Sequence, residues 1–175
     1  MPIGTKTKQY ETPNHPYQGE RISSEHSLID RYGLANKEEL WRAQSELRSY
    51  RREARDLLAQ PQDDETVERR REEFLGRLAR LGILGEADEL GDILGLEVED
   101  VLERRLQTVA YRKGLANTPQ QARQFIVHGH VVVGDRRHQV PSYLVDVDEE
   151  DAVAFDETSP LADELHPERA EDQES

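Results

Sequence analysis

The stretch at 118–135, TPQQARQFIVHGHVVVGD, constrains the fold most, because each of its parts favours one local structure. Residues 118–121 have the pattern of a helix N-terminus: the threonine can cap the helix, proline suits its first turn, and a glutamine holds the capping-box position. Residues 128–129 predict the end of this helix. The three valines at 131–133 then predict a strand, and 134–135 predict a tight turn. A capped helix must therefore lead directly into a β-hairpin.

Another helix is predicted just upstream, with Asp100 placed to cap it and Gly114 placed to end it. Apolar residues recur between these two positions at helical spacing: Val101, Leu102, Leu106 and Val109. Residues 143–147 predict the returning strand of the hairpin. Residues 100–147 therefore predict a compact module in which two helices pack on a small hairpin.

A helical body is predicted before this module, at 36–99. Asn36 with Glu39 three residues later forms a capping box for a long helix, which ends at 60–61, where a proline follows a glutamine. The apolar stripe of this helix consists of Leu40, Ala43 or Gln44, Leu47, Ala54 and Leu58. A further helix is predicted at about 65–80. Its buried side is expected to carry Phe74, Leu75, Leu78 and Leu81.

Both ends of the chain lack apolar periodicity. Residues 1–20 contain three prolines and two glycines, so we expect 1–35 to form an extended arm that either stays disordered or folds onto a partner. Residues 148–175 hold twelve acidic side chains and one basic one, and are expected to form an acidic C-terminal tail. Together with 36–99 and 100–147, these segments predict an α+β, mostly helical fold: a helical N-terminal body plus a small two-helix and β-hairpin module.

The composition argues against several classes of protein. The chain has 175 residues, of which 35% are hydrophobic and 34% charged, enough to bury a modest core. No apolar run approaches the roughly 18 residues of a membrane span, and the first residues lack the apolar region of a secretory signal. The absence of cysteine excludes disulfides and thiolate metal sites. We therefore expect a cytoplasmic protein with no membrane partner.

The charge is distributed unevenly along the chain. The net charge is −14, which argues against a nucleic-acid partner because contacts with phosphate require Lys and Arg. Residues 101–147, however, hold seven Lys and Arg against three Asp and Glu, a net charge of +4. The acid is concentrated in 61–100, with a net charge of −8, and in 148–175, with −11. The predicted module is therefore a basic segment in an acidic chain.

The basic residues are 19 Arg and only 4 Lys. Arg carries a planar fork that binds phosphate bidentately, whereas surface carboxylates keep a protein hydrated and dispersed. An acidic, Arg-rich chain fits a proteome adapted to high salt, where the Debye length falls to about 3 Å at 1 M. The alternative to a halophilic source is an ordinary protein whose acidic side chains keep it soluble. We expect a halophilic source and short, direct contacts with any anionic partner.

Two groups of basic residues are candidates for an anion-binding surface. Arg48, Arg51, Arg52 and Arg55 are spaced three and four apart, so they share one side of the long helix, which is either a solvated face or an anion-binding edge. In the module, Arg104, Arg105, Arg112 and Lys113 lie on the polar side of the first helix, and the N-terminus of the second helix can bind phosphate. Such a surface suits structured RNA, whose deep groove side chains cannot enter.

His128 and His130 allow a metal site as an alternative. Alternate residues of a strand share a face, so the two imidazoles could converge. Zinc requires three or four ligands, however, and His138 is the only imidazole nearby. Gly129 is also expected to break the helix between the two histidines. We therefore expect no metal, with at least one of the two histidines partly buried at the corner between helix and strand.

The segment ERRLQTVAYRKGLANTPQQARQFIVHGHVVVGDRRHQVPSYLV resembles the small RNA-binding module of small-subunit ribosomal protein four. The matching elements are RRLQT, Gly-x-Ala before the second helix, AR-x-x-I, HGHV and the closing PS. The flanks YETPNHP-x-x-x-ER, RYGL-x-NKEELW, ELR-x-YRREAR and LHPER resemble the archaeal and eukaryotic branch of the same family. The resemblance therefore covers nearly the whole chain.

The resemblance implies a structural constituent of the small ribosomal subunit. It implies direct binding to 16S rRNA in the body of the subunit early in assembly, and contact with neighbouring proteins, notably small-subunit protein five, which affects decoding accuracy. It places the arm at 1–35 on rRNA and implies no cofactor and no small-molecule substrate. Some relatives hold zinc through N-terminal cysteines, which this chain lacks, and its acidic tail departs from the family's usual basic balance.

The residues that the resemblance places on RNA come from three parts of the chain. They are Lys6, Lys8 and Tyr10 in the arm; Arg48, Arg51, Arg52 and Arg55 in the body; and Arg104, Arg105, Arg112, Lys113, Asn117, Thr118, Gln120, Arg123, Gln124, His128 and His130 in the module.

Two other functions are compatible with the module. An RNA-modifying or tRNA-charging enzyme would need a catalytic domain, but the helical body contains no nucleophile pattern, metal cluster or Gly-rich phosphate loop. A non-ribosomal RNA-binding protein would carry different flanking sequence. We therefore expect no catalytic residues and a ribosomal role.

Overall fold

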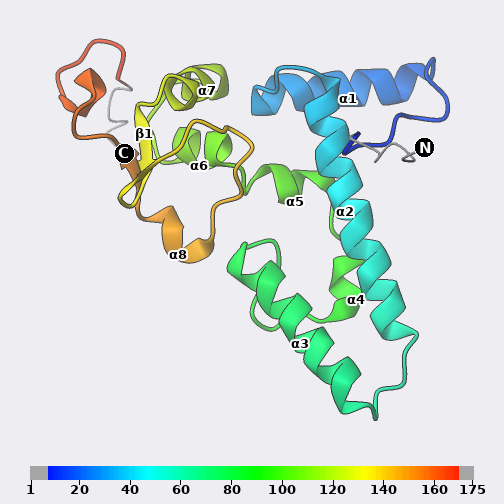
Figure 1. Cartoon of the computed structure of the whole chain (residues 1–175). Coiled ribbons are helices and arrows are strands. Elements are labelled where there is room, and N and C mark those ends of the chain that lie inside the picture. The colour runs from blue at the N-terminus through cyan, green and yellow to red at the C-terminus, as the bar shows by residue number, and fades with distance from the viewer. Residues whose placement is uncertain (1–7, 170–175) are drawn as a thin grey trace, which may run out of the picture.

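The computed structural model describes residues 8–169. The body consists of α1 (Gly19–Tyr32), α2 (Lys37–Leu58), α3 (Glu65–Arg80), α4 (Leu90–Ile93) and α5 (Val98–Leu102). The module consists of α6 (Leu106–Arg112), α7 (Pro119–Val127), β1 (Val131–Val133), β2 (Arg136–Arg137), α8 (Val147–Glu150), β3 (Val153–Phe155) and the 3-10 helix η1 (Pro160–Ala162). Figure 1 shows two lobes joined through α5. The α+β, mostly helical fold is confirmed.

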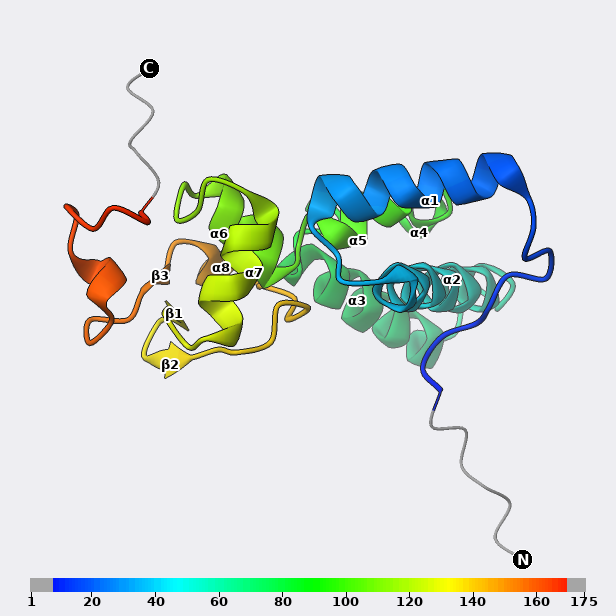
Figure 2. The ribbon, with the colours of Figure 1, turned by 90° about the horizontal axis from the view of Figure 1, so that it is seen from above.

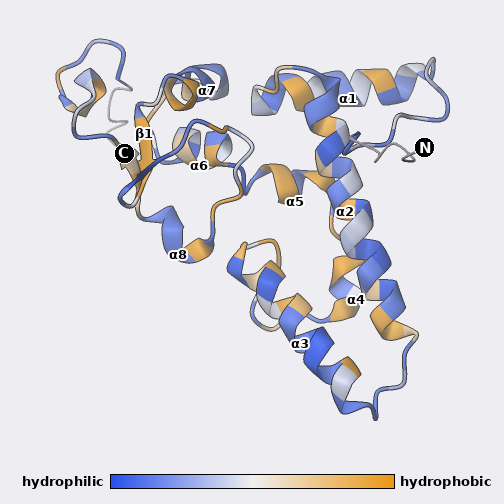
Figure 3. Cartoon of the chain, in the orientation of Figure 1, coloured by the Kyte–Doolittle hydropathy of each residue, from blue (hydrophilic) through white to orange (hydrophobic). Residues whose placement is uncertain are grey.

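The long helix α2 is the axis of the body. The side chain of Asn36 accepts a hydrogen bond from the amide of Glu39, as the capping box predicts. In Figure 1, α3 and α4 lie along its second half and α1 crosses its first half. Figure 3 shows the apolar residues on the sides of these helices that face one another.

The apolar stripe of α2 differs from the prediction at its C-terminal end. Leu40, Ala43, Leu47 and Ala54 are buried, but Leu58 is 43% exposed and Leu57 is buried in its place. Tyr50, Ala54 and Leu57 follow one another at spacings of four and three, which keeps the buried stripe on one side of the helix. In α3, Phe74 and Leu78 are buried and Leu75 and Leu81 are partly buried against the same core.

The prediction of an extended arm over 1–35 is wrong for residues 19–32, which form α1. The buried side of α1 contains a charged residue, Glu25, which is only 3% exposed. Its carboxylate accepts hydrogen bonds from Arg21 at 2.7 Å and from the indole of Trp41 at 3.2 Å. This paired carboxylate interrupts the apolar periodicity and hides the helix from sequence patterns.

The single helix predicted between Asp100 and Gly114 is two helices. Asp100 does not cap the helix; its carboxylate lies in the first turn of α5 and accepts a hydrogen bond from the amide of Glu97 at 2.7 Å. The chain becomes extended at Arg105, which pairs with Leu144 in an isolated β-bridge. Pairing with this returning segment is therefore what divides the helix.

The sheet has three antiparallel strands in the order β2-β1-β3. The hairpin partner of β1 is β2, in which Arg137 lies opposite Val132. The predicted return strand at 143–147 is wrong, because this segment runs beside the start of α6 instead. The other edge of β1 pairs with β3, where Val153 lies opposite Val133. Figure 2 shows these short strands beside α7.

Residues 148–169 are folded, so the prediction of a tail starting at 148 is wrong over this range. Two apolar residues after position 147 are buried: Val153 is 2% exposed and Leu161 is 5% exposed. Both join the second core cluster, which also contains Leu106, Val109, Ile126, Val131 and Val145. The acidic residues of this segment lie on its surface. They led to the prediction of a tail, although the segment contains the third strand, β3.

Candidate nucleic-acid interface

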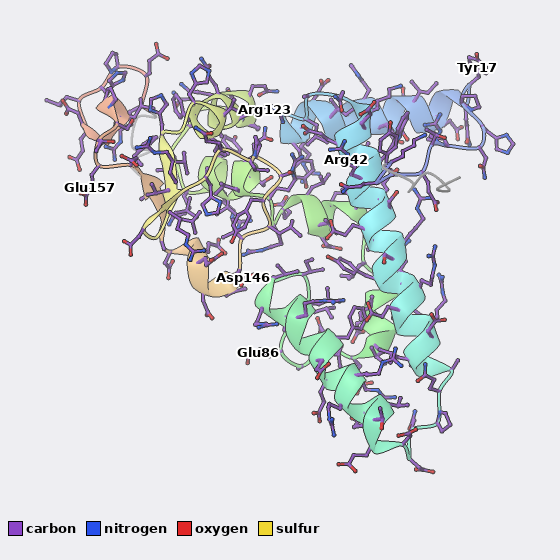
Figure 4. All side chains as sticks on the ribbon, in the orientation of Figure 1. Tyr17, Arg42, Glu86, Arg123, Asp146 and Glu157 are labelled. Atoms are coloured by element: carbon purple, nitrogen blue, oxygen red, sulfur yellow. The ribbon has the colours of Figure 1, made fainter. Side chains whose placement is uncertain are left out.

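The body and the module are joined by a cluster of three charged side chains. The carboxylate of Glu39 on α2 accepts a hydrogen bond from Arg105 at 3.0 Å and two from Arg123 on α7, at 2.6 and 3.0 Å. Figure 4 labels Arg123 on α7 at this junction. The side chains of Glu39 and Arg105 are 18% and 5% exposed. Glu39 therefore fixes α7 and the start of α6 to the long helix of the body.

Burial raises the pKa of the Glu39 carboxyl, but the hydrogen bonds and positive charges of Arg123 and Arg105 outweigh it, so the pKa lies below its usual range. Burial lowers the pKa of the Arg105 guanidinium, and the charge of Glu39 counteracts this change. The Glu39 carboxylate is therefore ionised at neutral pH and supplies the charge that Arg105 needs inside the protein.

A buried amide forms a second link between the two lobes. The side-chain amide of Gln107 on α6 donates hydrogen bonds to the carbonyls of Gly33, at 2.8 Å, and Pro119, at 2.9 Å. Gly33 has a left-handed φ of 62° and follows α1. A β-carbon at this position would lie 2.8 Å from both Gln107 Nε2 and Pro119 Cβ. The first turn of α7 therefore packs directly on the end of α1.

Several basic residues of α6 and the turn before it hold the folded C-terminal segment. The guanidinium of Arg104 donates to the carboxylate of Glu150 and to the carbonyl of Val145, both at 2.8 Å. Arg112 donates to Glu150 at 2.8 Å and to Glu103 at 3.2 Å. The hydrogen bond from Arg104 lowers the pKa of Glu150, and that from Arg112 adds to the effect. Arg104 is therefore bound within the protein, whereas the paired Arg112 side chain is still 43% exposed.

Lys113 follows α6 and donates hydrogen bonds to three main-chain carbonyls, those of Glu150, Asp151 and Val153, at 2.7 to 3.0 Å. Lys113→Met is expected to lower the free energy of unfolding by about 1 kcal/mol, since hydrogen bonds to a charged group are lost at a partly wet site. Hydrogen exchange at the amides of 153–155 should accelerate. Lys37→Met is the control, because the side chain of Lys37 makes no hydrogen bond or ion pair within residues 8–169. Equal effects of the two substitutions would contradict the role of Lys113.

The surface position predicted for Arg104 and Arg105 is wrong, because their residues are 7% and 4% exposed. Arg123 is half-buried and paired. The signal that distinguishes such arginines is the position of acidic partners, Glu39 and Glu150, which lie 66 and 46 residues away in the chain from Arg105 and Arg104. A sequence pattern does not reveal that proximity. These three arginines therefore position the module and do not form its outer surface.

The arginines of α2 divide into two pairs. Arg48 is bound to Glu11 at 2.6 Å, and Arg51 donates to the carbonyl of Leu96. Arg52 and Arg55 are exposed and make no ion pair within the described part of the chain. The latter pair is therefore available to an external anion.

The exposed side of α7 carries the polar residues predicted there. Asn117, Gln120, Gln124 and His128 are exposed. The Thr118 side chain accepts a hydrogen bond from the amide of Gln121, so it caps the helix as predicted. The expectation that the α7 N-terminus binds phosphate is not supported, because a β-carbon added at Gly33 would lie 3.0 Å from the Gln120 amide nitrogen. The end of α1 therefore covers this terminus.

The two histidines have different environments. His128 is exposed, whereas His130 is half-buried and its Nδ1 lies 2.8 Å from the Ser159 hydroxyl. Their ring centroids are 6.4 Å apart. Within the described residues, no group of three His, Asp or Glu side chains is arranged to hold a metal ion.

The N-terminal segment reaches α2 through Tyr10. Its ring lies 6.0 Å from that of Trp41, with the ammonium of Lys8 at 4.8 Å and the guanidinium of Arg42 at 5.9 Å. Figure 4 labels Arg42 on α2. Lys6 lies outside the described residues. One cation from the segment, Lys8, and one from α2, Arg42, therefore lie around the Tyr10 ring.

Sequence patterns missed several exposed basic residues that make no ion pair within residues 8–169. These are Arg31, Arg42, Arg69, Arg70, Arg80 and Arg136. Arg31, Arg42 and Arg80 have no basic residue beside them, whereas Arg69 and Arg70 belong to a run of three arginines at 69–71 among acidic residues, and Arg136 is next to Arg137. Together with Lys8, Arg52, Arg55 and the polar side of α7, they make up the candidate interface.

Comparison with known proteins extends over the whole chain. Residues 104–151 match the S4 domain. The chain is 66% identical over 174 residues to "Small ribosomal subunit protein uS4" of Natronomonas pharaonis, covering 99% of this chain and 100% of that protein. The protein of the same name from Haloarcula marismortui has the same identity and coverage. The one from Methanococcus aeolicus is 50% identical over 168 residues, covering 94% of this chain and 93% of that protein.

The S4 domain match begins at Arg104 and ends just before β3. The match therefore includes α6, α7, the hairpin and α8. The relatives from haloarchaea agree with the halophilic source that the Arg-rich, acidic composition predicts. No helix within the described residues is long and apolar enough to cross a membrane.

Proposed function

Since the chain belongs to the uS4 family of small ribosomal subunit proteins, we propose that it binds 16S rRNA directly in the body of the subunit. Its role in the ribosome is structural, and its S4 domain is of the RNA-binding type. In this proposal the protein binds rRNA early, nucleates assembly, and acts with protein uS5 on decoding accuracy. It works on cytoplasmic ribosomes and needs neither a cofactor nor a small-molecule substrate.

One observation carries the proposal: the similarity to uS4 runs through the body as well as the module, at 66% identity over 99% of the chain. A non-ribosomal protein that shared only the S4 domain would match over residues 104–151 alone. The two-lobed arrangement also fits the proposal, because Glu39 and Gln107 fix one lobe against the other. A rigid pair of lobes suits an RNA whose helices meet at a fixed angle.

Sedimentation of ribosomal subunits tests this function. Small subunits from a haloarchaeal host that expresses the tagged chain should be washed at native salt and the protein quantified against 16S rRNA. We expect one copy per small subunit and little free protein. A chain found mainly at the top of the gradient, with no copy in washed subunits, would rule out a structural ribosomal role.

Arg52 and Arg55 are expected to contact phosphate, because they are exposed and unpaired within the described residues. The slope of log K against log salt is negative, and each loss of a phosphate contact lowers its magnitude by about 0.7–0.9. Arg52→Gln/Arg55→Gln should therefore reduce the slope for 16S rRNA by about 1.5. Arg77→Gln is the control, since Arg77 is paired with Glu53 on α2. Binding titrations at several KCl concentrations measure the slope; an unchanged slope would remove these two residues from the interface.

A further inference from the structure

A cleft lies between the two lobes, where the end of α1 faces α6. The residues that line it include Arg31 and Tyr32 at the end of α1, Glu103 at the end of α5, and Tyr111, Arg112 and Pro119 from the module. Its back wall is rigid, because the buried Tyr32 donates a hydrogen bond from its hydroxyl to Glu103 at 2.8 Å. We call these six residues the interlobe cleft. No single lobe contains it.

The cleft contains an exposed aromatic side chain without a partner. Tyr111 is 42% exposed, although it stands on α6 next to residues that are almost completely buried. Within the described residues, the side chain of Tyr111 makes no hydrogen bond and its ring pairs with no other ring, although its main-chain carbonyl accepts a hydrogen bond from Gly114. An exposed tyrosine whose ring is not needed for the core is a surface on which another flat ring can stack.

Two guanidinium groups flank this aromatic surface. Arg31 lies over the Tyr32 ring at 5.3 Å and is exposed. The side chain of Arg112 is 43% exposed, although it also pairs with Glu103 and Glu150. Among the described residues, Glu103 is the only acidic one that lines the cleft, so the lining side chains carry a net charge of +1. An occupant that combines a flat aromatic ring with adjacent negative charge fits this arrangement.

We propose that the interlobe cleft binds one unstacked base of structured RNA, which stacks on Tyr111 while Arg31 and Arg112 hold the neighbouring phosphates. This inference rests on the proposed rRNA binding and adds a specific subsite to it. RNA-binding proteins commonly take splayed bases on aromatic side chains, because every base offers a π-face. Since both lobes form the cleft, the base would bind only when the lobes hold their mutual position.

Substitutions at Tyr111 separate stacking from charge. Tyr111→Ala should weaken binding of the full chain to a 16S rRNA transcript about tenfold, in the range for loss of one stacked base. The salt slope should stay unchanged, since no phosphate contact is lost. Tyr111→Phe and Tyr111→Trp keep a ring and should bind as the wild type does. Val127→Ala on α7 is the control, because Val127 is apolar, 47% exposed and outside the cleft.

Arg31→Gln, unlike Tyr111→Ala, should change the salt dependence of binding. The magnitude of the slope of log K against log salt should fall by about 0.7–0.9, because one phosphate contact is lost. Chemical probing of the complex supplies an independent measurement. With the wild type, one base should be protected from base-modifying reagents; with Tyr111→Ala, that base should react while the hydroxyl-radical footprint of the backbone persists.

Several outcomes would overturn the proposal. They are wild-type affinity and base protection in Tyr111→Ala, or a loss in Tyr111→Phe as large as in Tyr111→Ala. If the wild type binds rRNA and substitution of Tyr111 has no effect, only the proposed base-binding cleft is overturned. Absence of any rRNA binding by the wild type would overturn both the cleft and the proposed function. If Tyr111→Ala weakens binding to a protein partner but not to rRNA, the cleft binds that protein and the RNA proposal is overturned.

Discussion

Glu39→Ala is expected to lower the free energy of unfolding by about 3 kcal/mol, because removing one partner of a buried ion pair leaves an uncompensated charge. The charge left behind is Arg105, whose side chain is 5% exposed. Arg123 loses two hydrogen bonds at the same time. The main-chain N–H of residue 39 can still donate to the capping side chain of Asn36, so the helix itself should persist. Urea unfolding at constant high salt measures the change.

Glu53→Ala on the same helix is the matched control for Glu39→Ala. Glu53 pairs with Arg77 across two side chains that are 41% and 50% exposed, and such surface pairs contribute less than about 1 kcal/mol. Equal destabilisation by the two substitutions would show that Glu39 does not link the lobes. A double-mutant cycle with Arg123→Ala should give a coupling energy of about 1 kcal/mol or more.

The contribution of Glu39 also has a defined pH dependence. Its pKa is lower in the folded protein than in the unfolded chain, so the stabilisation is complete above the unfolded carboxyl pKa. It disappears as the pH falls through the folded pKa. The wild type should therefore lose more stability than Glu39→Ala on acidification.

Gly33→Ala is expected to cost about 3 kcal/mol. An L-residue in the left-handed region costs about 1–2 kcal/mol, and crowding in a packed interior adds about 1–3 kcal/mol. The new β-carbon would lie 2.8 Å from both Gln107 Nε2 and Pro119 Cβ, which requires α1 and α7 to move apart. Affinity for 16S rRNA should fall as well, because the two lobes would lose their mutual position.

Gly114→Ala provides a control with the same backbone strain and no crowding. Gly114 has a φ of 78°, and a β-carbon there would contact nothing within 4 Å. We expect a loss of about 1 kcal/mol from the backbone alone. Thermal unfolding of both variants measures the difference between them. If Gly33→Ala is no more destabilising than Gly114→Ala, the packing of α7 on α1 is not important for stability.

Local signals in the sequence were reliable where the contacts that satisfy them are also local. The caps at Asn36 and Thr118, the boundaries of α2, α3 and α7, and the strand at 131–133 all follow from side chains within four residues. The burial of Phe125 and Ile126 follows from helical spacing. These elements could be predicted because a cap or a stripe needs no information from elsewhere in the chain.

Predictions failed where distant residues decide the structure. The helix α1 buries a carboxylate that Trp41 satisfies, and the third strand comes from an acidic segment. Leu144 divides a predicted helix by pairing with Arg105. In each case, a partner between 16 and 39 residues away overrides the local pattern.

The same limit applies to the candidate site. A basic side chain in the sequence reads as a possible phosphate ligand, but Arg104, Arg105 and Arg123 are bound to Glu150 or Glu39. In an acidic chain, a carboxylate from another helix or strand is readily available to pair with such an arginine. The exposed cations Arg31 and Arg42 gave no signal because no other basic residue lies within four positions of either of them. Which arginines face outward is therefore decided by the tertiary structure.

Competitive binding of the purified chain to 16S and 23S rRNA at native salt tests the central claim most directly. The structure of two lobes fixed by Glu39 and Gln107 predicts saturable binding of one chain per 16S rRNA. We expect 16S rRNA to bind at least about a thousandfold more tightly than 23S rRNA, at the lower end of the usual range of specific over non-specific recognition. Equal affinity for the two rRNAs, with no saturation at one chain per 16S rRNA, would contradict a specific role in the small subunit.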